Sequence, residues 1–150
     1  MSLSRLRQRI AGTLVASVVA LGAVLLVMPS PAMAATGPHY WMYTDDSSPN
    51  GGRVDFWSNG DIVQLCDVHA DGAHADLMVY DKSAGGELRY HITASGSGVC
   101  NTVRASDGGW YDLPEAHCFL FVIKLYDGRV SVESEDRASW RNYNDAKANC

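Results

Sequence analysis

Short stretches of alternating apolar and polar residues, separated by clusters of Gly, Asn, Asp and Ser, run from residue 39 to residue 133. Alternation at every second residue is typical of a strand that is buried on one face. The stretches recur about every 8–12 residues, and no long amphipathic helix pattern interrupts them. This spacing predicts an all-β fold, either an antiparallel immunoglobulin-like sandwich or a small barrel.

The stretch from residue 61 to residue 81 is the strongest local signal. Apolar runs at residues 62–66 and 76–80 flank Asp71-Gly72. An Asp-Gly pair between alternating runs is typical of a tight hairpin turn, so we expect these two runs to pair with each other. Asn59-Gly60 predicts another hairpin turn of type I′ for the same reason.

Residues 87–93 form the cleanest amphipathic pattern, which predicts Leu88, Tyr90 and Ile92 on the inner face. Residues 117–126 are apolar on both faces and are expected in the middle of a sheet. Residues 134–150 are compatible with a last strand or with a short helix. The side chains expected in the core are Phe56, Leu65, Val79, Tyr90, Phe119, Phe121 and Ile123.

The first 34 residues have the pattern of a secretory signal peptide. Three arginines precede an uncharged apolar run from Ile10 to Met28, and prolines then precede Ala32-Met33-Ala34, which suits a signal peptidase. An uncleaved membrane anchor is the alternative, because the run comes close to the length that spans a bilayer. We expect cleavage after Ala34, a secreted, extracellular protein and a single domain over residues 35–150.

The residues after Ala34 are acidic, with nine basic and 17 acidic side chains and hence a net charge of −8. Such a charge repels phosphate backbones and anionic lipid, so the sequence predicts neither nucleic-acid binding nor membrane binding after removal of the signal. A cationic partner is compatible with this charge, and so is a purely solubilising role.

Four cysteines, all after Ala34, predict two disulfides in an oxidising compartment. Three pairings are possible. We favour Cys66–Cys100 with Cys118–Cys150, because sequential pairing closes two loops of similar, moderate length. Each would stabilise the fold by roughly 3–4 kcal/mol.

Residues 67–72 overlap the start of a calcium-binding loop, with Asp67, His69 and Asp71 at alternate positions and glycine at the sixth. These three residues are the candidate metal ligands, and His69 with His74 could instead hold a transition metal. The bidentate glutamate of a calcium loop would fall on Met78. A solvated turn is therefore the preferred interpretation, and no cofactor is expected.

No catalytic constellation stands out. An Asp-His pair could orient a base, but a nucleophile is also needed, and neither Gly-x-Ser-x-Gly nor a free thiol is expected. The sequence predicts a protein without enzymatic activity. The five histidines that could take the catalytic role of the base are His39, His69, His74, His91 and His117.

Exposed aromatic residues are the better candidates for ligand binding, because they could stack on a sugar or a peptide. Trp41 and Trp57 fall near strand ends, and Trp110 and Tyr111 follow a Gly-Gly turn. The competing interpretation is that several of these rings only fill the core.

Residues 113–119, Leu-Pro-Glu-Ala-His-Cys-Phe, resemble the segment that leads into the penultimate strand of immunoglobulin-like and fibronectin-type sandwiches. Proline stands one position early, and Phe119 takes the place of the corner tyrosine, so the hydrogen bond of that corner is not expected. The resemblance implies a sandwich and nothing about chemistry.

A second resemblance covers most of residues 35–150. The signal peptide, Gly60-Asp61 with Cys66-Asp67, Ala70-Asp71-Gly72, Gly98-Val99-Cys100 and Leu113-Pro114-Glu115 together resemble small secreted actinobacterial β-sandwich proteins of unknown function. These motifs are turns and cysteines, so the resemblance implies a fold and carries no catalytic residues.

The sequence therefore predicts a secreted, non-enzymatic binding module, whose partner is an unknown extracellular surface, carbohydrate or protein. The first alternative is a secreted protease inhibitor, for which the segment from Tyr111 to Ala116 could serve as the exposed loop. A small hydrolase is the second alternative.

Overall fold

The structure is a computed structural model that describes residues 37–45, 51–128, 130–143 and 150; for residues 130–134 only the backbone is described. The expected signal peptide therefore lies outside the described residues. Within them, no helix combines the length and the hydropathy that a membrane span requires.

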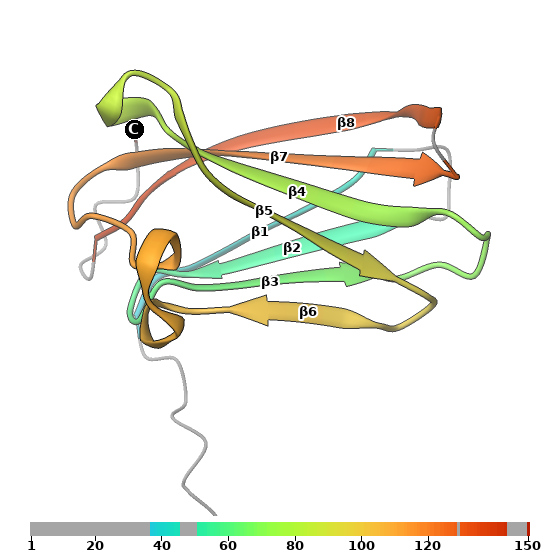
Figure 1. Cartoon of the computed structure of the whole chain (residues 1–150), viewed down its shortest axis with the longest axis horizontal. Coiled ribbons are helices and arrows are strands. Elements are labelled where there is room, and N and C mark those ends of the chain that lie inside the picture. The colour runs from blue at the N-terminus through green and yellow to red at the C-terminus, as the bar shows by residue number, and fades with distance from the viewer. Residues whose placement is uncertain (1–36, 46–50, 129, 144–149) are drawn as a thin grey trace, which may run out of the picture. The chain divides into compact units, whose positions relative to one another are not determined.

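Eight strands of the described residues form two antiparallel sheets that pack face to face (Figure 1). The predicted all-β, antiparallel sandwich is confirmed. Sheet A has the order β1 (His39–Tyr43), β2 (Gly52–Trp57), β3 (Ile62–Asp67) and β6 (Cys100–Val103). Sheet B has the order β5 (Glu87–Ser95), β4 (His74–Asp81), β7 (Cys118–Asp127) and β8 (Val130–Arg141). Three 3₁₀ helices lie in the connections, namely η1 (Lys82–Ala84), η2 (Ala105–Asp107) and η3 (Gly109–Tyr111).

The core lies between the two sheets. Phe56 of β2 and Phe121 of β7 meet across it with their ring centroids 5.1 Å apart, and Trp140 of β8 packs against both rings. Complete burial of such side chains contributes roughly 1.5–3 kcal/mol each. All seven side chains predicted for the core are buried.

β7 is a central strand, as its apolar residues on both faces predicted, since it pairs with β4 on one side and β8 on the other. The expected hairpin of β2 and β3 is also confirmed. Its turn differs from type I′ in that Gly60 and Asp61, rather than Asn59 and Gly60, have positive φ angles, 86° and 50°.

The predicted hairpin of residues 61–81 is wrong. β3 pairs with β2 and β6, whereas β4 pairs with β5 and β7, so the segment between β3 and β4 crosses from one sheet to the other. A type I′ turn needs positive φ at both central residues, and of Asp71-Gly72 only Gly72 has it. The crossing lets the apolar faces of both strands point into the core.

The prediction for Leu88 is also wrong. Tyr90 and Ile92 are buried as expected, but Leu88 is 46% exposed. The pairing of β4 with β5 shifts between Val79 and Tyr80, so that Tyr90 faces Val79 while Leu88 faces Tyr80. Such a bulge inserts one extra residue and reverses the inward and outward positions beyond it.

The undecided segment at the C-terminus continues as a strand as far as Arg141, while residues 144–149 lie outside the described residues. Trp140 is half-buried and packs against the core.

Both predicted disulfides are present. Cys66 and Cys100 face each other on β3 and β6, and Cys118 at the start of β7 is joined to Cys150. Two disulfides are consistent with a protein that resides outside the cytoplasm.

Candidate functional site

The outer face of β1 and β2 brings together aromatic, basic and acidic side chains. Because Val54 and Phe56 point into the core, the alternate residues of β2 point outward, and those of β1 follow through the strand pairing. His39 lies beside Trp57, Trp41 beside Asp55 and Tyr43 beside Arg53. We call these six residues the aromatic face.

Asp55 lies at the centre of the aromatic face. Its side chain is only 3% exposed although it is on the outer surface of the sheet. A buried carboxylate needs partners that replace water. Oδ1 accepts a hydrogen bond of 2.6 Å from the Arg53 guanidinium and lies 2.8 Å from Nε2 of His39. The same hydrogen bond raises the pKa of Arg53 above its usual value.

The two partners of Asp55 in turn contact aromatic rings. The His39 ring stacks on Trp57 with centroids 4.5 Å apart and planes within 4° of parallel. The Arg53 guanidinium lies 5.4 Å from the centre of the Tyr43 ring. One carboxylate thus positions a ring on each side of Trp41.

Trp41 is the open part of this arrangement, because 58% of its surface is exposed. It contacts Tyr43 edge to face, with ring centroids 5.6 Å apart. On β3 and β6 the row continues with Gln64, which lies opposite Asp55, and with Thr102, to whose hydroxyl the Gln64 amide donates a hydrogen bond of 3.0 Å. The face therefore combines flat aromatic rings with fixed hydrogen-bonding groups.

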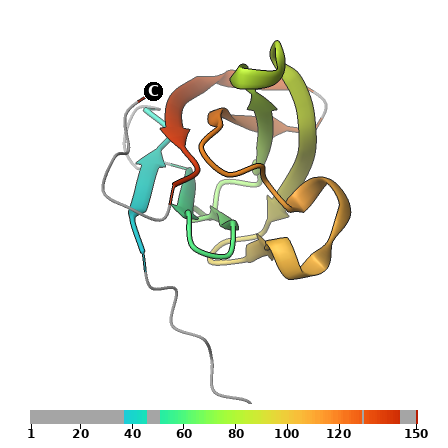
Figure 2. The same cartoon turned by 90° about the vertical axis from the view of Figure 1, so that its left-hand side faces the viewer.

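The structure separates the four aromatic residues singled out from the sequence. Trp41 and Trp57 belong to the aromatic face, whereas Trp110 and Tyr111 lie on η3 in the connection between β6 and β7 (Figure 2). Trp110 is 53% exposed and lies under the Arg89 guanidinium, 4.6 Å from it. Tyr111 packs on Tyr90, with ring centroids 5.0 Å apart. These two rings thus form a separate, smaller cluster.

Sequence reasoning missed Arg53 and Asp55 of the aromatic face and considered His39 only for a catalytic role. The alternation of β2 indicated that Asp55 points outward. Its burial and its two partners depend on the pairing of β1 with β2, which sequence alternation does not specify. The available signal was a charged or aromatic residue at every second position of both strands.

In the predicted metal loop, the carboxylates of Asp67 and Asp71 already accept hydrogen bonds from backbone N–H groups of the protein. Asp67 is buried and accepts hydrogen bonds from the N–H groups of His69 and Gly96. Asp71 accepts from the N–H of Ala73, which lowers the pKa of Asp71, and also contacts the His69 ring. Among the residues that the structure describes, no three His, Cys, Asp or Glu side chains form a group suited to a metal ion.

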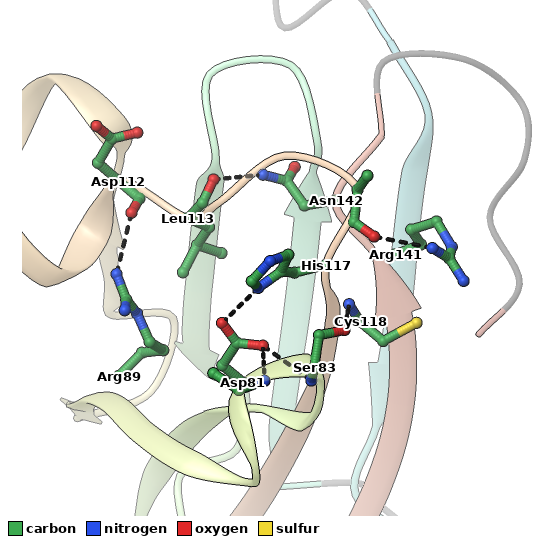
Figure 3. Close-up of polar contacts among 11 residues, drawn as sticks. Asp81, Ser83, Arg89, Asp112, Leu113, His117, Cys118, Arg141 and Asn142 are labelled. Atoms are coloured by element: carbon green, nitrogen blue, oxygen red, sulfur yellow. Dashed lines mark hydrogen bonds and ion pairs between the residues drawn. The ribbon is translucent and has the colours of Figure 1, made fainter.

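An Asp-His pair of the kind found in hydrolases does occur at one end of the sandwich (Figure 3). Nδ1 of His117 lies 2.8 Å from the buried carboxylate of Asp81, which also accepts from the N–H groups of Ser83 and Ala84. The Ser83 hydroxyl accepts a hydrogen bond from the N–H of Cys118. In the described part of the chain, no hydroxyl or thiol lies within hydrogen-bond distance of the His117 ring, and all four cysteines are oxidised.

The segment proposed for an inhibitory loop is held inward at its centre. Leu113 is 2% exposed, and its carbonyl accepts a hydrogen bond from Asn142 (Figure 3). The Leu113 N–H and the Asn142 amide both donate to Asp61. Burial of Asp61 raises its pKa to about 6. Tyr90 is buried nearby, and desolvation raises its pKa as well, with the charge of Asp61 adding to the effect. An inhibitory loop would need an exposed side chain at its centre, and this one is buried.

Comparisons of the chain with protein-family models, with curated proteins and with solved structures find no match. The assignment of a function therefore depends on the geometry of the site. The fold and the aromatic face together define a disulfide-bonded β-sandwich with one open surface of rings and hydrogen-bonding groups.

Proposed function

We propose that the protein is an exported, non-enzymatic binding module that holds a carbohydrate chain on the aromatic face. The observation that carries the proposal is the Asp55 carboxylate, which through Arg53 and His39 positions Tyr43 and Trp57 beside the exposed ring of Trp41. A binding surface gains affinity when its groups are already held in place before the ligand arrives.

The shape of the face favours an extended ligand. It is the outer surface of a sheet, so a flat chain can lie across it without entering a cavity. Aromatic rings bind the C–H faces of sugars through apolar contact, while the polar groups beside them can exchange hydrogen bonds with hydroxyl groups. Gln64 and Thr102 extend this polar row away from Trp41.

Charge narrows the class of carbohydrate. The net charge of −8 after residue 34 opposes binding of a polyanionic chain. A neutral polysaccharide is therefore the proposed ligand. Export is supported by the signal-peptide pattern and by the two disulfides, which form in oxidising compartments.

The decisive experiment compares two exposed tryptophans. Trp41→Ala removes the open ring of the aromatic face, and Trp110→Ala removes a ring of similar exposure outside it. Binding to insoluble cellulose, chitin and xylan is measured by depletion, and binding to the matching oligosaccharides by tryptophan fluorescence. We expect Trp41→Ala to weaken binding at least tenfold, about 1.4 kcal/mol, and Trp110→Ala to leave it unchanged.

Two results would contradict the proposal. If Trp110→Ala abolished binding while Trp41→Ala did not, the ligand would lie on η3 instead of the aromatic face. If the unmodified protein bound no polysaccharide but inhibited trypsin-like or subtilisin-like proteases, the inhibitor function would replace the binding function.

A further inference from the structure

The outer face of sheet B contains a shallow groove of about 240 Å³ that is unrelated to the aromatic face. Its floor is apolar and is formed by Met78 and Tyr80 of β4 together with Leu120 and Val122 of β7. The strand pairing places Met78 beside Val122 and Tyr80 beside Leu120, so the floor is continuous. We call this feature the sheet B groove.

Three basic side chains line the groove, namely Lys82, Lys124 and Arg137, and the last two share one counter-ion. Glu135 of β8 contacts both the Lys124 ammonium and the Arg137 guanidinium. These hydrogen bonds lower the pKa of Glu135, so its charge persists in mildly acidic solution. This end of the groove therefore keeps a net charge of +1, but both of its cations already contact a carboxylate.

Lys82 at the opposite end has no such counter-ion. It follows β4 directly, as the first residue of η1, and its ammonium group donates a hydrogen bond of 3.4 Å to the hydroxyl of Ser139. Within the described part of the chain, no carboxylate forms an ion pair with it. The groove thus has an apolar floor, and the ammonium group at one end has no carboxylate partner among the described residues.

We propose that the sheet B groove binds a small amphipathic monoanion, a medium-chain aliphatic carboxylate. Its alkyl chain lies over Tyr80, Leu120 and Met78, and its carboxylate accepts hydrogen bonds from Lys82 and Ser139. The volume lies just below the roughly 300–1,000 Å³ typical of pockets for drug-sized molecules, which suits a small ligand. A polyanion is disfavoured by the acidic net charge of the protein, and a neutral ligand would make no use of Lys82.

The test uses decanoate as the probe and the methionine methyl groups as local reporters. Met78 lies on the floor of the groove, whereas Met42 of β1 packs against the core, so the two report on different places. In protein labelled with ¹³C-methyl methionine, Met78→Leu and Met42→Leu assign the two signals. We expect decanoate to shift the Met78 signal saturably and to leave the Met42 signal in place.

Two lysines of the same groove supply the matched variants. Lys82→Gln is expected to weaken decanoate binding at least tenfold, because it removes the cation that no carboxylate of the described residues contacts. Lys124→Gln is expected to change it less than threefold, because the Lys124 ammonium already contacts the Glu135 carboxylate. Methyl decanoate, which has no charge, should bind both variants and the unmodified protein equally weakly, and acetate should not shift Met78.

Two results of this test would overturn the proposal. Equal binding of decanoate to the unmodified protein and to Lys82→Gln would overturn the proposal, and so would the absence of a saturable shift of the Met78 signal. Lys82 is exposed, and an unchanged circular dichroism spectrum of its variant excludes misfolding as the cause of lost binding. Polysaccharide binding is expected to persist in both lysine variants, so this test is independent of the proposed function.

Discussion

The aromatic face and the sheet B groove each contain a carboxylate with two basic partners, yet the two carboxylates differ in burial. Asp55 on sheet A is 3% exposed between His39 and Arg53, whereas Glu135 on sheet B is 30% exposed between Lys124 and Arg137. Water competes for an exposed carboxylate and salt screens it, so such a pair contributes little to stability or to geometry. Water cannot take the place of the partners of a buried carboxylate, so those partners are held in position.

This difference underlies the two proposals. On the aromatic face the rings are held in fixed positions, whereas in the sheet B groove an ammonium group is available to an anion. On sheet A the Asp55 carboxylate holds Arg53 and His39 against the rings of Tyr43 and Trp57. On sheet B the Glu135 carboxylate leaves one cation, Lys82, unpaired among the described residues. The same strand geometry thus supports two different kinds of surface.

The largest expected effect comes from the core that both faces share. Phe121→Ala removes a fully buried ring that contacts Phe56 and Trp140, and it should lower the free energy of unfolding by about 3–5 kcal/mol. The measurement is urea denaturation, with Leu88→Ala as the control. Because Leu88 is exposed, its variant should stay within about 0.5 kcal/mol of the unmodified protein. Similar losses from both variants would mean that the register of β5 differs from the one described.

The next largest effect is expected at Asp61, a buried carboxylate that forms no ion pair with the described residues. The pKa of Asp61 is raised to about 6, so protonation stabilises the folded state. This contribution is complete below about pH 4 and is lost as the pH rises through 6; it amounts to about 3 kcal/mol.

Asp61→Asn isolates this contribution, because asparagine tolerates the positive φ of that position. Urea denaturation between pH 4 and pH 7 should show that the difference between the unmodified protein and Asp61→Asn changes with pH. A constant difference over that range would show that Asp61 does not titrate there.

A smaller effect is expected at the centre of the aromatic face. Asp55→Asn keeps the shape of the side chain but loses the charge that holds Arg53 and His39, so stability should fall by about 1–3 kcal/mol. Polysaccharide affinity should fall about tenfold, as the rings lose their fixed positions.

The matched control is Asp76→Asn on sheet B, where the carboxylate is also partly buried, lies near His74 and His91 and accepts from Thr93. This variant should leave polysaccharide affinity unchanged. Equal losses of affinity from the two aspartates would remove the special role of Asp55.

The smallest effect is expected from Glu135→Gln. Because the carboxylate is exposed, its loss should leave the thermal midpoint unchanged within experimental error, at low and at high salt. A drop of several degrees would place Glu135 on a level with Asp55 and would remove the contrast between the two faces.

The sequence predicted the strands well, because a strand buried on one face must alternate. The core positions of Phe56, Leu65 and Phe121 follow from that alternation, and the central place of β7 follows from its apolar residues on both faces. Prediction failed at Leu88, where a bulge reverses the alternation without leaving a mark in composition.

The candidate site was only half predictable for a similar reason. Trp41 and Trp57 could be named as candidate binding rings from residue type and position. Their association through Asp55 can be predicted only when the pairing of β1 with β2 is known. The tertiary structure also shows that Trp110 and Tyr111 lie elsewhere, on η3.

Residue types in order along the chain predicted an all-β sandwich or small barrel and favoured one of three cysteine pairings, and the structure confirms the sandwich and that pairing. Only the tertiary structure decided that β3 and β4 belong to different sheets and that Asp55 is buried between two basic side chains. The physical reason is that backbone N–H and C=O groups are the same at every residue and accept any neighbouring strand. The choice of partner is made by packing of side chains across the core, which no single stretch of sequence contains.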